Sequence, residues 1–88
     1  MGHDQDEIKA ILWHMLGLDW IKPYYHRGGK DYYMYCRNYY SAGVKGNPVL
    51  DAFPPGMVHK CTTDIGVIYF LTQAGVKWAA KLLDVGLK

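Results

Sequence analysis

The apolar residues near the start of the chain recur at helical spacing. Four of them follow the i, i+3, i+4, i+7 pattern of an amphipathic helix, namely Ile8, Ile11, Leu12 and Met15. Asp4 and Glu7 fit a capping box, which covers backbone N–H groups that a first helical turn leaves free. Gly17 suits the position just after a helix. The pattern therefore predicts a helix over Gln5 to Leu16.

The stretch from Leu18 to Gly29 contains a proline and two adjacent glycines, which favour a connection over a helix. Beyond it, Asp31 is placed to cap a second helix over Tyr32 to Ala42. Tyrosine is only a modest helix former, so a strand from Tyr32 to Cys36 is an alternative that the sequence leaves open.

Two runs of strand-forming residues, Met57 to Thr62 and Val67 to Leu71, occur in the last third of the chain. They flank a short turn in which Gly66 permits a tight reversal, so they predict a β-hairpin. Thr72 is placed to cap a last helix, which carries an apolar stripe and is predicted to end at Gly86.

A short helix is predicted before the hairpin, because Asn47 can cap it and Pro48 suits its first turn. The resulting order is helix, helix, short helix, β-hairpin, helix. This order predicts one small α+β domain over residues 1–88, with a winged-helix-like fold. In a DNA-reading winged helix the short helix would enter the major groove. Here it contains Asp51 and neither Arg nor Lys, which argues against base readout there.

Composition fits a folded globular domain, and the charge neither requires nucleic-acid binding nor excludes it. Half of the 88 residues are hydrophobic, and ten basic residues against eight acidic ones give a net charge of +2. No apolar run approaches the ~20 residues that a membrane-spanning helix needs. The first residues are polar and do not resemble a signal peptide, so a cytoplasmic location is expected.

The candidate chemistry of the chain is sparse. Cys36, Cys61, His26 and His59 offer donor atoms for zinc, but their spacing fits no compact ligand pattern. We expect no metal or other cofactor, and we expect both cysteines to pack as small hydrophobic residues. A nucleophile motif, an oxyanion-hole motif and a phosphate-binding loop are all lacking, so the sequence predicts that the protein is not an enzyme.

Three segments resemble a group of small proteins encoded by bacteriophages and prophages: His14 to Leu18, Lys22 to Tyr24, and Tyr69 to Gly75. The tyrosine-rich segment from Tyr32 to Tyr40 departs from the pattern of that group. The end of the third segment is also similar to the end of the wing in winged-helix regulators, where the threonine caps the last helix. The resemblance implies a regulator or inhibitor of host machinery, with anti-CRISPR proteins as one form.

A protein partner fits the eight tyrosines, because a domain this small cannot satisfy every tyrosine hydroxyl in its core. Exposed tyrosine beside arginine is typical of protein interfaces. We therefore expect an inhibitor of a host defence complex in the bacterial cytoplasm, which contacts a host protein or ribonucleoprotein complex; a homodimer is also compatible. The expected partner-binding residues are Tyr24, Tyr25, Arg27, Lys30, Tyr33, Arg37 and Tyr40.

DNA binding by a winged-helix transcriptional regulator is the alternative function. Basic and aromatic residues alternate between positions 22 and 30, and this mixture suits phosphate contact combined with base stacking. Lysines elsewhere in the chain can add contacts to the backbone of a duplex. The candidate nucleic-acid contacts are Lys22, Lys60, Lys77 and Lys81.

Overall fold

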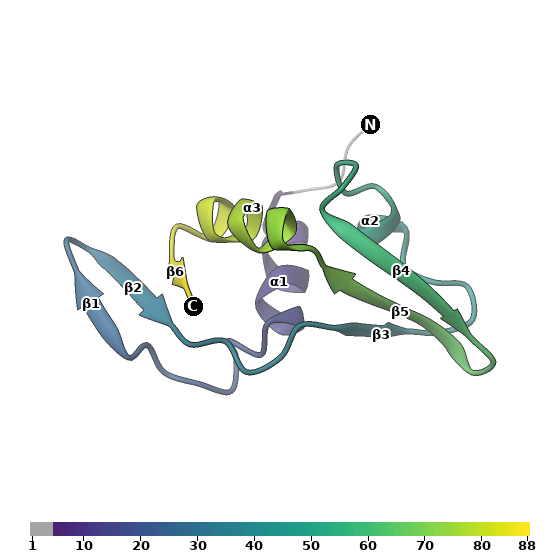
Figure 1. The fold of residues 1–88 in the computed structure, drawn as a ribbon, viewed down its shortest axis with the longest axis horizontal. Helices are drawn as coiled ribbons and strands as arrows, with labels where there is room; N and C mark the ends of the chain where they lie inside the picture. Colours follow the sequence, from purple (N-terminus) through teal and green to yellow (C-terminus); the bar gives the residue numbers. More distant parts are fainter. Residues whose placement is uncertain (1–4) are drawn as a thin grey trace.

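Helix α1 (Gln5–Met15) forms where the apolar spacing predicts it, and Gly17 follows it with a positive φ of 70°. The computed structural model describes residues 5–88, so the predicted capping residue Asp4 lies outside the described residues. In this part of the chain, three helices and two three-stranded sheets form a small α+β fold (Figure 1). The α+β class predicted from the sequence is confirmed.

Elements with local sequence signals also appear near their predicted places. Helix α2 (Pro48–Asp51) begins after Asn47, whose side chain accepts hydrogen bonds from two backbone N–H groups of the first turn. The predicted hairpin is formed by β4 (Val58–Thr63) and β5 (Gly66–Leu71), paired along their whole length. Helix α3 (Gln73–Leu83) follows directly. Its cap, Thr72, accepts a hydrogen bond from the N–H of Gly75 at 3.0 Å, as predicted.

The predicted helix from Tyr32 to Ala42 is wrong. This stretch contains the end of β2 (Lys30–Tyr33), a connection and β3 (Tyr40–Ala42), so the strand alternative is correct in kind but not in extent. Asp31 lies inside β2 rather than at a helix cap. The physical reason is pairing: β2 bonds to strands on both of its sides, and its β-forming tyrosines alternate between two faces.

The last helix ends before Gly86, because Asp84 adopts the left-handed conformation with φ 56°. Gly86 instead begins a final strand, β6 (Gly86–Leu87), which pairs in parallel with β2. A Cβ atom at Gly86 would collide with the ring of Tyr32, so this close approach requires glycine. The order of helices and strands therefore differs from the predicted winged-helix order.

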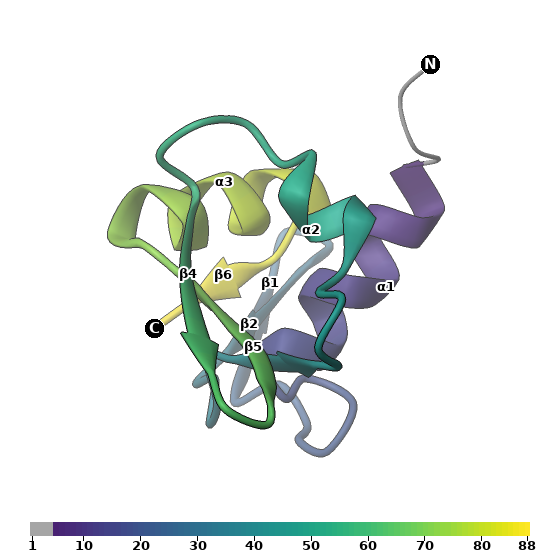
Figure 2. The same ribbon diagram turned by 90° about the vertical axis from the view of Figure 1, so that its right-hand side faces the viewer.

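The two sheets lie on either side of the helices, and their hairpins extend toward opposite ends of an elongated molecule (Figure 1). Sheet A has the order β1-β2-β6, with β1 (Tyr25–Arg27) antiparallel to β2. Sheet B has the order β3-β5-β4, with β5 in the centre. Helices α1 and α3 contact each other and lie between the sheets (Figure 1), and Figure 2 shows both helices from the side of the β4–β5 hairpin.

The core lies where α1 meets α2, α3 and the central strand β5. It is built from large apolar side chains, among them Leu12, Met15, Leu16, Leu18, Leu50, Tyr69 and Leu71. Within the described residues, none of the helices has the length and apolarity that crossing a membrane requires.

Candidate binding surface

The connection between the two sheets is fixed against the C-terminal end of α1. Tyr39 donates its backbone N–H to the carbonyl oxygen of Met15 at 3.2 Å. The thiol of Cys36 lies 3.7 Å from the carbonyl oxygen of Gly17, as a weak donor. The last carbonyl groups of a helix have no partner within it, so this connection satisfies groups that would otherwise need water.

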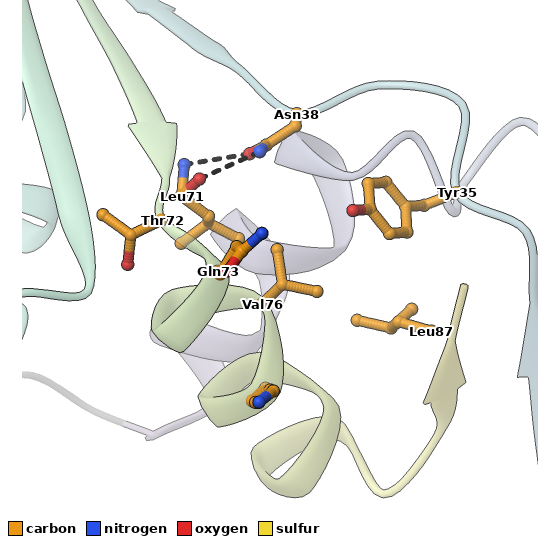
Figure 3. Close-up of a pocket in the computed structure, with 8 residues that line it drawn as sticks. Tyr35, Asn38, Leu71, Thr72, Gln73, Val76 and Leu87 are labelled. Carbon is orange, nitrogen blue, oxygen red and sulfur yellow. Dashed lines mark hydrogen bonds between the residues drawn. The ribbon is translucent and has the colours of Figure 1, made fainter.

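Asn38 fixes the same connection to sheet B. Its side-chain oxygen accepts the backbone N–H of Leu71 at 2.9 Å, and its side-chain nitrogen donates to the carbonyl of Leu71 at 3.0 Å (Figure 3). An amide that bonds both groups of one residue imitates a neighbouring strand, and here it continues the pairing of β5 beyond the first residue of β3. The 36–39 segment is therefore held from both sides.

Arg37 is oriented by a carbonyl group and a ring. Its Nη2 donates to the carbonyl oxygen of His14 in the last turn of α1, and its guanidinium lies 5.5 Å from the centre of the Tyr39 ring. Its Nε is buried without a hydrogen-bond partner in the part of the chain that the structure describes. Because no carboxylate among these residues pairs with it, the positive charge of Arg37 remains available to a partner.

Two exposed aromatic side chains flank this arginine. Trp20 is 77% exposed and Tyr39 is 45% exposed. Both line a shallow depression of about 560 Å³. We call this region the Trp20–Tyr39 surface, and it consists of Trp20, Cys36, Arg37, Asn38 and Tyr39.

A second group of aromatic and basic residues lies on the β1–β2 hairpin. The register places Tyr25 opposite Tyr32, with their rings 5.5 Å apart, and Arg27 opposite Lys30. Residues opposite each other share a face of the sheet, and every second residue of a strand shares that face too. These four side chains therefore form one surface, which we call the β1–β2 face.

The structure places the partner-binding residues predicted from the sequence in different parts of the molecule. Tyr24, Tyr25, Arg27 and Lys30 belong to the hairpin or its entry, whereas Arg37 belongs to the Trp20–Tyr39 surface. Tyr40 is partly buried in β3, and its ring packs edge-on against His14 at 5.9 Å. In the predicted helix from Tyr32 to Ala42, Tyr33, Arg37 and Tyr40 would share one face, and because no helix forms there they do not.

Tyr33 is a core residue and not a surface residue, which corrects its predicted role. It is 6% exposed, and its ring packs edge-on against Trp13 at 5.5 Å. Burial raises the pKa of its hydroxyl, and the nearby charge of Asp31 raises this pKa further. The alternation of β2 explains the placement, since Tyr32 faces the opposite side from Tyr33.

The lysines proposed for nucleic-acid contact lie on different elements. Lys22 lies in the connection before β1, and Lys60 lies on β4, where it pairs with Asp51 at 3.2 Å. That hydrogen bond and charge raise the pKa of Lys60. Lys77 and Lys81 lie on α3.

Both cysteines are exposed, so their predicted packing as small hydrophobic residues is wrong. Cys36 belongs to the connection between the sheets and Cys61 to the edge strand β4. Among residues 5–88, no group of three or more His, Cys, Asp and Glu side chains is placed to hold a metal ion.

Sequence reasoning missed Trp20 and Tyr39 as surface residues. Trp20 lies in a connection without periodicity, where the sequence carries no signal of exposure. In the predicted helix from Tyr32 to Ala42, Tyr39 would share a face with Tyr32 and Tyr35 and not with the expected partner-binding residues. The hairpin residues were found because basic and aromatic residues alternate in the sequence itself.

Comparison of the chain with protein-family models finds no match, and comparisons with curated proteins and with solved structures find none either. The functional argument therefore depends on the surfaces described above.

Proposed function

We propose that the protein is a non-enzymatic binding protein that docks on another protein through the Trp20–Tyr39 surface. The supporting observation is an exposed tryptophan and an exposed tyrosine beside an arginine that is already oriented. Trp, Tyr and Arg contribute most of the free energy of many protein interfaces. Because the 36–39 segment is bonded to α1 and to sheet B, little conformational entropy is lost when a partner binds.

The partner we propose is a host protein or ribonucleoprotein complex, and the role is that of a phage-encoded inhibitor in the bacterial cytoplasm. The segments similar to phage proteins support this choice. Inhibition of a host defence complex, as anti-CRISPR proteins perform it, is the specific form we propose. Such inhibition needs only occlusion of the partner and no chemical step.

We further propose that the fold is winged-helix-like, with the winged-helix part serving as scaffold. The β4–β5 hairpin, the pairing of β3 with β5 and the Thr72-capped α3 support this relation. Helix α2 has four residues and includes Asp51, which is too short and too acidic for a typical DNA-reading helix. A scaffold role leaves the connection between the sheets as the binding element.

The proposal is tested by capturing the partner from a lysate of the bacterial host and measuring its affinity for purified variants. We expect Trp20→Ala and Tyr39→Ala each to weaken binding about tenfold or more, as hot-spot residues do. Ile65→Ala is the matched control, because Ile65 is 89% exposed in the turn between β4 and β5, and it is not part of the Trp20–Tyr39 surface. Thermal unfolding of each variant shows whether the fold is retained.

If folded Trp20→Ala and Tyr39→Ala variants bind and inhibit like the wild type, the Trp20–Tyr39 surface is not the interface. An equal loss in Ile65→Ala would likewise remove the assignment, since it would show that the effect is not local.

The β1–β2 face favours a second candidate function, the binding of nucleic acid. Tyr25 and Tyr32 offer rings for base stacking, and Arg27 and Lys30 offer charge for phosphates. The specific form of nucleic-acid binding that the sequence suggests is that of a winged-helix DNA-binding regulator. Lys60 contributes less to this function, because Asp51 already pairs with it. The test is the affinity for nucleic acid at increasing salt concentrations. We expect this affinity to fall steeply with salt, and Arg27→Ala should make the fall less steep.

A further inference from the structure

A depression of about 410 Å³ lies where β6, the connection between the sheets and the first turns of α3 meet (Figure 3). Leu71, Val76 and Leu87 contribute apolar side chains to its lining. Its volume falls within the range of small-molecule sites. It differs from the Trp20–Tyr39 surface, with which it shares only Asn38.

The polar groups of this depression fall into two sets. Asn38 and Thr72 are already bonded: the amide of Asn38 pairs with the backbone of Leu71, and the hydroxyl of Thr72 donates to the carbonyl of Gly56. The second set consists of the Tyr35 hydroxyl, the Gln73 amide and the Lys77 ammonium. Gln73 and Lys77 are exposed and Tyr35 is partly buried, and within residues 5–88 none of the three groups has a hydrogen-bond or ion-pair partner.

The unpartnered groups are mainly donors. Lysine offers only donors, and tyrosine and glutamine offer donors together with acceptors. No acidic residue lines the depression, so the charge of Lys77 is not neutralised there. In Figure 3 the hydroxyl of Tyr35 points toward the space beside Val76. An acceptor with a negative charge is therefore the polar group that this site fits best.

We propose that this depression binds a small carboxylate with an apolar body. The carboxylate accepts hydrogen bonds from Lys77 and Tyr35, and the apolar body covers Leu71, Val76 and Leu87. An inorganic anion would leave these apolar side chains uncovered, whereas a neutral apolar molecule would gain nothing from the charge of Lys77. The proposal is independent of the protein-binding function, since it uses other side chains.

The test is an NMR titration of the ¹⁵N-labelled protein with hexanoate and with hexanamide, which lacks the charge. We expect hexanoate to shift the amides of Gln73, Val76 and Leu87 saturably and hexanamide to bind about tenfold more weakly or worse. Lys77→Ala should weaken hexanoate binding to a similar degree. Tyr35→Phe, which removes only the hydroxyl, should cause a severalfold loss.

Lys81→Ala is the matched control, because Lys81 lies one turn further along α3, is exposed and does not line the depression. It should bind hexanoate like the wild type. The proposal is overturned if hexanoate causes no saturable shifts. It is also overturned if Lys77→Ala and Lys81→Ala behave alike, or if the shifts gather at the separate apolar depression beside Phe53 and Trp78.

Discussion

Tyr69 connects strand β5 to the start of helix α2 through a single hydroxyl group. It is 1% exposed, and its hydroxyl donates to a carboxylate oxygen of Asp51 at 2.9 Å. The hydroxyl oxygen of Tyr69 also accepts the backbone N–H of Asn47 at 2.9 Å. The sequence indicated the Asn47 cap and the strand separately. It gave no sign that a tyrosine would join them, because the two residues are far apart in the chain.

Replacing Tyr69 with phenylalanine should destabilise the fold by about 1–3 kcal/mol, because the N–H of Asn47 would lose its partner in a partly buried place. Denaturant unfolding measures the change. Tyr24→Phe is the control, since this exposed hydroxyl should contribute little. An unchanged midpoint for Tyr69→Phe would show that water replaces the hydroxyl without cost.

The same substitution should alter the acid dependence of stability. The hydrogen bond from Tyr69 lowers the pKa of Asp51, and Lys60 lowers it further. A carboxyl group with a lowered pKa in the folded state stabilises the fold above its unfolded pKa of about 3.9, and this stabilisation is lost as the pH falls through the folded pKa. The stability difference between the wild type and Tyr69→Phe should therefore shrink below about pH 4.

At the scale of elements, the parts with local signals could be predicted from the sequence. Apolar spacing identifies α1, the caps at Asn47 and Thr72 identify the starts of α2 and α3, and a short turn identifies the β4–β5 hairpin. Strands β3 and β6 have three and two residues and are defined by partners distant in the sequence. Such pairing leaves no local pattern, so it could not be predicted.

The candidate binding surfaces also differ in how far local sequence signals could predict them. The alternation of basic and aromatic residues singled out Tyr25, Arg27 and Lys30, but the sequence predicted a connection there and not the β1–β2 hairpin that places them beside Tyr32. The Trp20–Tyr39 surface depends on the tertiary contacts that fix Arg37 and Asn38. Tyr33 was misplaced because a helix and a strand assign its side chain to different faces.

Gly86→Ala tests whether the parallel pairing of β6 with β2 holds sheet A to the core. The added Cβ atom would meet the ring of Tyr32, so we expect a loss of about 1–3 kcal/mol from overpacking. The amide of Lys88, which donates to the carbonyl of Tyr33, should then exchange with solvent faster. Gly43→Ala is the matched control, since a Cβ atom there meets nothing within 4 Å. Equal effects of the two substitutions would contradict a specific role for β6.

At the scale of the whole molecule, the β1–β2 face lies on sheet A, whereas the 36–39 segment of the Trp20–Tyr39 surface joins sheet A to sheet B. Trp20 precedes Tyr24 by four residues, and sheet A lies at the end opposite the β4–β5 tip (Figure 1). The molecule extends over 43 × 28 × 19 Å, so a partner on the β1–β2 face need not touch the Ile65 end. The net charge of +2 is small, and long-range electrostatic attraction is therefore not the main feature of the molecule.

The salt dependence of binding should distinguish the two proposed functions. A complex that depends on Trp20 and Tyr39 buries apolar surface, so its Kd should change less than about threefold between about 50 and 300 mM salt. Binding of a nucleic acid through Arg27 and Lys30 would weaken steeply instead, because each phosphate contact releases counterions.

The measurement is a titration at several salt concentrations with the captured partner and with a labelled single strand. The variants Arg27→Ala and Tyr39→Ala are compared with Lys45→Ala, an exposed lysine outside both surfaces. A steep slope that only Arg27→Ala reduces would assign the function to the β1–β2 face and exclude the protein interface proposed at Trp20 and Tyr39.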